Sequence, residues 1–404
     1  MKKRAGMILC IIIGLFFTSS ISFSNQFNDQ WNDIRKKAKG QTIYFNAWGG
    51  SETINDYIRN AAIRAEKEFK FKVIHVKLTD ISLAISRILT EKAVGRTKNS
   101  SVDLLWINGE NFRAMKKNKL LFGPFTQKLP NYKYVDTKNK PTTLFDFTVP
   151  VDNMEAPWGM AQLIFMYDTA KVKTPPENMK DLLEFAKKNP GRVTYPAPPN
   201  FHGTTFLKQA LLELVKDKNI LYRPVSNADF AKVTKPLWEY LDKLHPLMWR
   251  KGKVFTNGAS KMKQLLNDGE IFISISFNPN AASNAIAKGE LPDTVRTYIH
   301  KPGTLGNTHF LAIPFNSSAK EAAMVFINFL LSPKCQAEKA DPGVWGDPTV
   351  LAINKLSRKD QKLFSKIPKG VATLLTKDLG TVLPEPHSTW VEAIEKEWKK
   401  RYNK

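Results

Sequence analysis

The side chains best suited to chemistry in this sequence lie in short loops that follow apolar segments. These loops carry aromatic and small polar residues: Trp48–Ser51, Asn108–Asn111, Pro157-Trp158, Tyr195–Thr204, Phe277-Asn278, Gly306–Thr308 and Trp345–Asp347. Aromatic faces supply contact area and a few polar groups fix orientation, which is how sites for small molecules are lined. We therefore predict that the loops converge on one cleft, whose ligand-binding residues are Trp48, Gly49, Ser51, Asn108, Glu110, Trp158, Tyr195, His202, Phe277, Asn278, Asn307 and Trp345.

Motifs for bond-making chemistry are missing from the sequence. It contains no phosphate-binding glycine loop, no dinucleotide fingerprint, no H-E-x-x-H pair and no G-x-S-x-G elbow. The six histidines are far apart and lack the spacing of metal ligands. His75 alternates with apolar residues and is typical of a structural side chain, whereas His202 lies on a glycine-containing loop. We predict a binding protein without metal or cofactor; the alternative is an exported hydrolase that uses His202 and carboxylates from separate loops.

Length and composition narrow the class of protein. The chain has 404 residues, of which 42% are hydrophobic, 61 are lysine or arginine and 37 are aspartate or glutamate. Domains of about 100 to 200 residues are the common unit, so we expect two lobes. The net charge of +24 could attract nucleic acid or anionic lipid. Because the lysines are scattered, we expect solvated helix faces and no nucleic-acid partner, with a basic surface binder as a second alternative.

The N-terminus has the layout of a secretory signal peptide. The basic residues Lys2–Arg4 precede an apolar run, Met7–Phe17, and small residues alternate at Ser22–Ser24. The apolar run is shorter than the roughly 20 residues that span a bilayer as a helix. We predict that residues 1–24 are removed and that the mature protein is soluble and periplasmic. Cys335 then remains as a single thiol, so the fold must form without an internal disulfide.

Apolar periodicity predicts alternating strands and helices in the first part of the chain. The expected strands are 43–45, 73–76 and 102–107, and the expected helices are 54–69 and 81–89. Such alternation favours a parallel sheet covered by helices, with ligands outside the carboxyl ends of the strands. Residues 123–157 have no sustained period and are expected to form long loops and short strands. Further strands are expected at 164–167, 271–277, 295–298 and 310–313, and a capped helix at 320–330.

Five segments occur in an informative order along the chain. They are Trp48–Ser51, Val102–Gly109, Pro157 leading to Tyr167-Asp168, Asp268–Glu270 before an apolar strand, and Ala322–Pro333. This order resembles the extracellular solute-binding proteins of ABC importers, over nearly the whole mature chain. The last segment, a helix ending in Phe-Leu-Leu-Ser-Pro, is the most specific. The chain is most similar to a poorly characterised branch grouped with thiamine, polyamine and sugar binders.

The resemblance implies an α/β, two-lobed type II periplasmic-binding-protein fold with a hinge and an interlobe cleft. We expect residues 1–24 as signal peptide, 25–159 and 284–314 as lobe 1, and 160–283 and 315–404 as lobe 2 with the C-terminal helices. Chain crossings are expected near 159–163 and 278–283. By position in the family, the resemblance also implies that Trp106 is a cleft residue, together with the turn at Asn108–Glu110, Tyr195, Phe277 and Trp345.

The implied function is the capture of a small solute between the two lobes and its delivery to an ABC permease and its ATPase. We expect the protein to act as a monomer. A solute shifts the protein to a closed state only through contacts that it makes better in that state. Tryptophan faces with nearby carboxylates at Glu52, Glu110 and Asp347 suit an organic cation or a sugar. An anion would instead use the helix entrance at Gly49–Ser51. We favour the organic cation and keep the sugar and the anion open.

Overall fold

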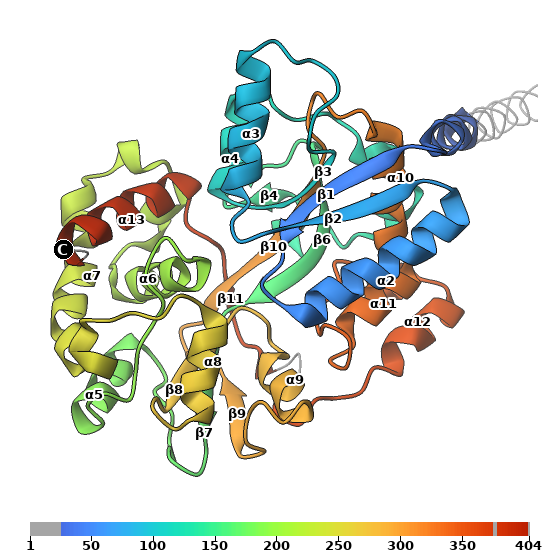
Figure 1. Cartoon of the computed structure of the whole chain (residues 1–404). Coiled ribbons are helices and arrows are strands. Elements are labelled where there is room, and N and C mark those ends of the chain that lie inside the picture. Colours follow the sequence, from blue (N-terminus) through green and yellow to red (C-terminus); the bar gives the residue numbers. More distant parts are fainter. Residues whose placement is uncertain (1–25, 375–377, 403–404) are drawn as a thin grey trace, which may run out of the picture.

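The computed structural model describes residues 26–374 and 378–402, which form two α/β lobes (Figure 1). The predicted signal peptide at 1–24 lies outside the described residues. Buried side chains form one apolar cluster in the second lobe and two in the first, one on each face of its sheet. No helix within the described ranges combines the length and the apolar character needed to cross a bilayer.

The first lobe is organised by a sheet with the strand order β11-β10-β3-β1-β2, in which β11 is Val382–Leu383 and β10 is Thr304–Ala312. Its parallel strands β1 (Thr42–Trp48), β2 (Lys72–Leu78) and β3 (Leu104–Ile107) alternate with the helices α2 (Glu52–Phe69) and α3 (Ser82–Ala93). The predicted alternation of strands and helices is therefore confirmed. The apolar pattern explains the two clusters, because successive residues of a strand point to opposite faces.

The local sequence of helix α2 explains where this helix begins and ends and which face it buries. Ser51 precedes it with extended backbone, Glu52 provides an acid in its first turn, and Lys70 ends it in the left-handed conformation. Its inward face is buried and includes Tyr57, Ile58, Ala61 and Ala65. The helix thus covers one face of the sheet and leaves its opposite side to solvent.

Other helices and short strands complete the first lobe. They are a helix over 26–38, α4 (Glu110–Lys117), β4 (Phe145–Asp146), β5 (Val149–Pro150), α10 (Lys320–Leu330), α11 (Pro333–Ala340) and α12 (Arg358–Ser365). The segment 123–157 consists mainly of loops, short 3₁₀ helices and the β4–β5 hairpin, as predicted.

Two antiparallel strands carry the chain between the lobes. They are β6 (Glu155–Gln162) and β10 (Thr304–Ala312), which pair along most of their length with an irregularity between His309 and Phe310. Every residue of β10 is buried. The start of β10 contacts the second core through Leu305, and its end lies in the first sheet. The lobes are therefore joined by paired strands, and the chain crosses a third time between Ser365 and Ser388.

The second lobe contains a three-stranded antiparallel sheet of order β8-β7-β9, formed by β7 (Ile164–Asp168), β8 (Ile273–Ser276) and β9 (Val295–Tyr298). Its helices are α5 (Met179–Lys188), α6 (Phe201–Leu214), α7 (Phe230–Leu244), α8 (Ala259–Asn267), α9 (Ala281–Ala287) and α13 (Ser388–Tyr402). The short strand β11 (Val382–Leu383) pairs with the start of β10. Further 3₁₀ helices lie at Thr126–Lys128, Pro130–Tyr134, Pro141–Thr143, Lys218–Tyr222, Val225–Asn227, His245–Leu247, Trp249–Gly252 and Ile353–Lys355.

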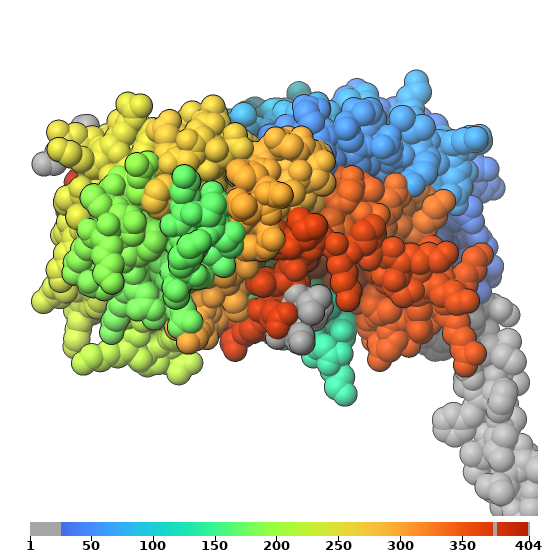
Figure 2. Space-filling model, turned by 90° about the horizontal axis from the view of Figure 1, so that it is seen from below, coloured from blue at the N-terminus to red at the C-terminus, as the bar shows by residue number. Residues whose placement is uncertain are grey.

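The predicted lobe boundaries differ from the structure in two segments. Helices α10, α11 and α12 lie against the first lobe (Figure 2). Within it, the ring of Phe326 contacts those of Phe45 and Phe71. The end of helix α9, from residue 284, and strand β9 were expected in the first lobe, but β9 hydrogen-bonds to β7 of the second. The second crossing is therefore β10 and not 278–283. Apolar periodicity predicts which face of a helix is buried, but not which core buries it.

Replacing Phe326 by alanine tests the position of α10. The ring is fully buried, so we expect the variant to lose about 3–5 kcal/mol of unfolding free energy, measured by denaturant titration. Amide hydrogen exchange should accelerate in β1 and α2 more than in β7 and β8. Val371→Ala, at a side chain that is 68% exposed, is the control and should change little. Equal acceleration in both sheets would contradict the placement of α10.

Candidate functional site

A buried lysine lies where the two lobes meet. Phe201, Thr204 and Lys208 are three and four residues apart on α6, so they share one face of that helix. The Lys208 side chain is 1% exposed, and its Nζ donates a hydrogen bond of 2.6 Å to Glu385 Oε2. Asn307 on β10 donates to the other oxygen of Glu385 at 2.9 Å. The lysine is thus held by a carboxylate that the crossing strand itself positions.

The first lobe contributes an aromatic ring to the same place. Phe147, at the tip of the β4–β5 hairpin, lies 4.5 Å from Lys208 Nζ, measured to the ring centroid, and Phe201 lies at 5.7 Å. These distances suit cation–π attraction. Because Phe147 belongs to the first lobe and Lys208 to the second, this contact joins the two lobes.

The hairpin holds Phe147 in an unusual backbone conformation. Phe147 has φ of 42° and Thr148 has φ of 67°, a region that bulky and β-branched residues rarely adopt. Both oxygens of Asp146 accept the backbone N–H of Gly109, at 2.7 and 2.8 Å. A Cβ on Gly109 would lie 2.9 Å from the Phe147 ring, and Gly109 itself has φ of 65°. Glycine is therefore required where β3 leads into α4.

Four carboxyl groups of the described residues lie within electrostatic reach of the Lys208 ammonium group, although only Glu385 bonds to it. We call the set of Lys208, Glu385, Glu395, Glu110 and Asp146 the junction cluster. Burial raises the pKa of Glu110 to about 7; Lys208 opposes the shift, and Glu395 and Glu385 add to it. Burial also raises the pKa of Asp146 well above its ordinary value, against the hydrogen bond from Gly109, and raises that of Glu395, against the bond that Thr204 donates at 2.6 Å. The cluster has too little positive charge for its carboxylates.

Three of the predicted tryptophans form a second group, which lies within the first lobe. Trp106 lies 5.2 Å from Trp158 and 5.5 Å from Trp345, between ring centroids, and Trp158 lies 5.2 Å from Trp345. His309 completes this aromatic cluster at 5.2 Å from Trp106. Trp158 and Trp345 are buried, so most of their faces are occupied by one another. Trp106 is the least buried of the three.

An ionic trio lies beside the aromatic cluster. Asp347 accepts from Lys339, and His309 Nε2 lies 3.0 Å from Asp347 Oδ2. Burial would raise the pKa of Asp347, but His309 and Lys339 outweigh it and lower the pKa. Gly159 on β6 is the neighbour of all three, and a Cβ there would overlap the trio. Glycine at this crossing position lets the buried charges approach the strand.

Asparagines of the second lobe bind the Trp345 segment of the first. Asn278 and Asn284 donate to Trp345 O at 3.2 and 2.8 Å, and Asn280 donates to Gly346 O. The predicted residue Asn278 thus joins the lobes through a backbone group. The ring centroids of Phe277 and Phe201 are 5.2 Å apart. Phe277 therefore packs against a ring that itself contacts Lys208.

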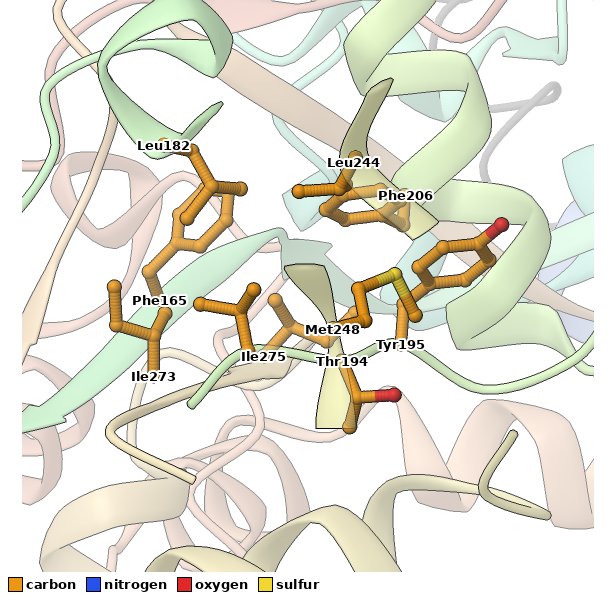
Figure 3. Close-up of a pocket in the computed structure, with 10 residues that line it drawn as sticks. Phe165, Leu182, Thr194, Tyr195, Phe206, Leu244, Met248, Ile273 and Ile275 are labelled. Carbon is orange, nitrogen blue, oxygen red and sulfur yellow. The ribbon is translucent and has the colours of Figure 1, made fainter. Parts of the chain in front are cut away.

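Tyr195 lies elsewhere than predicted. It is fully buried in the second core, where its hydroxyl lies 2.7 Å from His245 Nε2 and accepts from Trp398 Nε1 at 2.8 Å. It lines a small apolar cavity with Phe206, Leu244 and Met248 (Figure 3). Its contacts are those of a structural residue, because the loop after it turns its ring inward against Phe206.

The remaining predicted residues are spread over both lobes. Trp48 is 40% exposed at the end of β1 and covers Gly50, while Gly49 lies against Lys77. Ser51 makes no side-chain capping bond. His202 lies in the first turn of α6, next to Phe201, and burial lowers its pKa to about 4. Asn108 precedes Gly109 and is partly buried. The structure thus joins Glu110, Asn307 and Phe277 to the junction but leaves Trp48–Ser51 apart from it.

Sequence reasoning missed the central residues of the junction. Lys208 carried a usable signal, because it is a single charged residue in the apolar stretch Phe206–Leu212 of α6. Asp146 and Phe147 fall in the aperiodic segment, and Glu385 and Glu395 lie far along the chain, so nothing local connects them. Among the described residues, no cluster of three or more histidine, cysteine, aspartate or glutamate side chains could hold a metal ion.

Two α/β lobes joined by crossing strands, with ionisable groups and aromatic rings buried where they meet, define a binding protein of the periplasmic two-lobed class. The profile of the bacterial extracellular solute-binding protein family matches residues 60–356. The chain belongs to this family.

Named relatives agree with this assignment. The chain is 46% identical over 373 residues to the protein YnjB of Escherichia coli K12, covering 92% of this chain and 94% of that protein. Its fold matches the periplasmic binding protein AfuA of Actinobacillus pleuropneumoniae with fructose-6-phosphate bound, with a TM-score of 0.62, 16% identity and coverage of 90% and 99% of the two chains. It also matches the spermidine/putrescine ABC transporter substrate-binding protein PotD of Streptococcus pneumoniae, with a TM-score of 0.56, 17% identity and coverage of 89% and 100%.

The family gives the general function. The protein is the solute-binding component of an ABC transport system, and its partners are a small-molecule solute and an ABC permease. The family implies a periplasmic or exported location. Family and fold are those of transport binding proteins, which bind and release their solutes without chemical change.

Replacing Gly159 by alanine tests the packing at the crossing strand. The added methyl group would overlap Asp347 and His309, and the ionic trio could not keep its geometry. We expect a loss of about 3 kcal/mol of unfolding free energy, measured by denaturant titration. Gly343→Ala is the matched control, because that glycine has only one contact, at 3.2 Å from Asp341. Equal losses in the two variants would show that the trio does not depend on Gly159.

Proposed function

We propose that the protein captures a small organic cation at the junction cluster, after export to the periplasm with removal of residues 1–24. The observation that carries this proposal is the charge of the junction. Four carboxyl groups there are within electrostatic reach of a single ammonium group, that of Lys208, which bonds to Glu385 alone, although the whole chain has a net charge of +24. A buried carboxylate is costly without a cation, so an entering positive charge would be favoured.

The two solved structures named above are described with different classes of solute. PotD is described as the substrate-binding protein of a spermidine/putrescine transporter, whereas AfuA was solved with a sugar phosphate bound. A cation beside Glu110, Asp146 and Glu395 would offset the burial that raises their pKa values, whereas a sugar phosphate would raise these pKa values further and would repel any of the groups that is ionised. Like charges in a buried site repel strongly. The junction therefore favours the cation of these two solute classes.

Closure follows from where the charges lie. Glu110 and Asp146 belong to the first lobe, whereas Glu395 belongs to α13 of the second. A cation between them would attract both sides, but only when the lobes are close. To move the protein from mostly open to mostly closed, a solute needs about 5.5 kcal/mol of such differential binding. The ring of Phe147 would add apolar contact.

Isothermal titration calorimetry tests the proposed solute class. Purified protein should release heat with one or more of thiamine, putrescine, spermidine and choline, and none with sulfate, fructose-6-phosphate or neutral sugars. Differential scanning fluorimetry provides a second readout, because a ligand that binds only the folded state raises the melting temperature. Binding of the anion or the sugar alone would overturn the organic cation.

The pH dependence of binding tests the role of Glu110. A cation binds the ionised carboxylate, so protons compete with it once the pH falls below the pKa of about 7. We expect the affinity to be nearly constant above about pH 8 and to fall by up to tenfold per pH unit below about pH 7. Glu110→Gln should weaken binding at about pH 8 and flatten the profile.

Glu52→Gln is the matched control for that variant. Glu52 is also an acid in the first turn of a helix, but its side chain is 81% exposed and it lies beside the Trp48 loop. The control should leave the affinity and its pH profile unchanged. A loss in Glu52→Gln with none in Glu110→Gln would move the site from the junction to the end of β1.

A further inference from the structure

Lys208 is an unusual residue to find at the meeting point of two lobes. Its ammonium group lies between a carboxylate, Glu385, and two aromatic rings, Phe147 and Phe201. A carboxylate and ring faces around a desolvated positive charge are the groups that recognise an ammonium ligand. The cage formed by Glu385, Asn307, Phe147 and Phe201 thus already holds a primary ammonium group, which the protein itself supplies.

The fit between Lys208 and its cage is incomplete. An ammonium group has three N–H donors, and within the described residues Lys208 donates only to Glu385. The carboxyl groups of Glu110, Asp146 and Glu395 are affected by its charge but accept no hydrogen bond from it. Two of the three N–H donors of Lys208 therefore have no hydrogen-bond acceptor among the described residues. A free ammonium compound is not limited by a helix backbone and could orient its N–H groups differently within the cage.

We propose that Lys208 is a tethered substitute for the solute, and that the cage is a subsite for a primary ammonium group which the solute takes over by displacing Lys208. This inference rests on the proposed function, because it specifies the head group of the cation. Lys208 also contacts Phe147 of the opposite lobe, so the lysine stabilises closure in the same way that the solute would. The displaced ammonium remains attached to α6, and it acts as an intramolecular competitor that lowers the apparent affinity.

Removal of the competitor gives a measurable result. Lys208→Met keeps a long apolar side chain and removes the charge. If Lys208 occupies the cage for at least nine-tenths of the time, its removal should tighten binding of n-butylammonium by about tenfold or more, measured by calorimetry. Tetramethylammonium, which has no N–H donor, should show a much smaller gain. If the lysine instead helps to hold the solute, the same variant would bind n-butylammonium more weakly, and the proposal would be wrong.

The distance between the lobes provides a second readout. Spin labels on Ile63→Cys and Val254→Cys, both exposed, report the separation of the lobes. The native Cys335 is buried, and burial raises the pKa of its thiol to about 11, so it should react little with the label. We expect Lys208→Met to shift the distance distribution to longer values and n-butylammonium to shift it back. An unchanged distribution in Lys208→Met would overturn the role of the lysine in closure.

Lys339→Met is the matched control. Lys339 is also a fully buried lysine that pairs with one carboxylate and lies near a ring, at 5.3 Å from Trp345, but its partners lie within the first lobe. This control should lower stability without opening the lobes or changing ammonium affinity. The double variant Lys208→Met/Glu385→Gln removes both buried charges, so it keeps the distance measurement available if the single variant does not fold.

The two proposals fail in different ways. If the unmodified protein binds an anion or a sugar and no cation, the proposed solute class is wrong, whatever Lys208 does. The protein could instead bind organic cations while Lys208→Met neither increases the distance between the lobes nor gains affinity for n-butylammonium. In that case the proposed solute class stands, and the proposal that Lys208 substitutes for the solute is wrong.

Discussion

The pairing of β6 with β10 is the interaction on which the rest of the structure depends. These strands link the two cores, and their register shifts between His309 and Phe310. The same pair of strands also supports both buried ionic groups: Asn307 orients Glu385 of the junction cluster, and Gly159 leaves room for the separate ionic trio of the first lobe. A change in the angle between the lobes must therefore move the strands that position the binding groups. The hinge and the candidate site are one mechanical unit.

Local charge, and not net charge, indicates what this protein binds. The basic side chains that give the chain its net charge are mostly solvated, and water and salt screen them. At the junction, burial removes that screening, so a few carboxylates determine the potential. Burial is the main cause of the raised pKa values of Glu110, Asp146 and Glu395, and neighbouring carboxyl groups add to it. A protein with a basic surface can therefore hold an acidic site between its lobes.

Much of the fold follows from the sequence, because period and turn chemistry are local properties. The apolar stripe of α2 and the alternation around β1 to β3 were predictable from spacing alone. The site was less predictable from the sequence. Spacing cannot tell whether Trp158 points into a core or into a cleft, and the structure shows that Trp158 is buried in the core. For the same reason, spacing could not show that Tyr195, predicted as a cleft residue, is buried in the second core. Lys208 and Glu385 are 177 positions apart, so only tertiary packing brings them together.

The strained hairpin tip explains how such a junction can both close and open. Positive φ at Phe147 and Thr148 costs on the order of 1–3 kcal/mol for each residue and persists only when surrounding contacts enforce it. Those contacts are the bonds of Asp146 to Gly109 and the position of the Phe147 ring over Lys208. Part of the attraction between the lobes is thus offset by strain in one of them. A closed state held by strong contacts alone would release its solute slowly, whereas one that carries strain lies nearer in free energy to the open state. A solute can then shift that balance with the contacts of one small molecule.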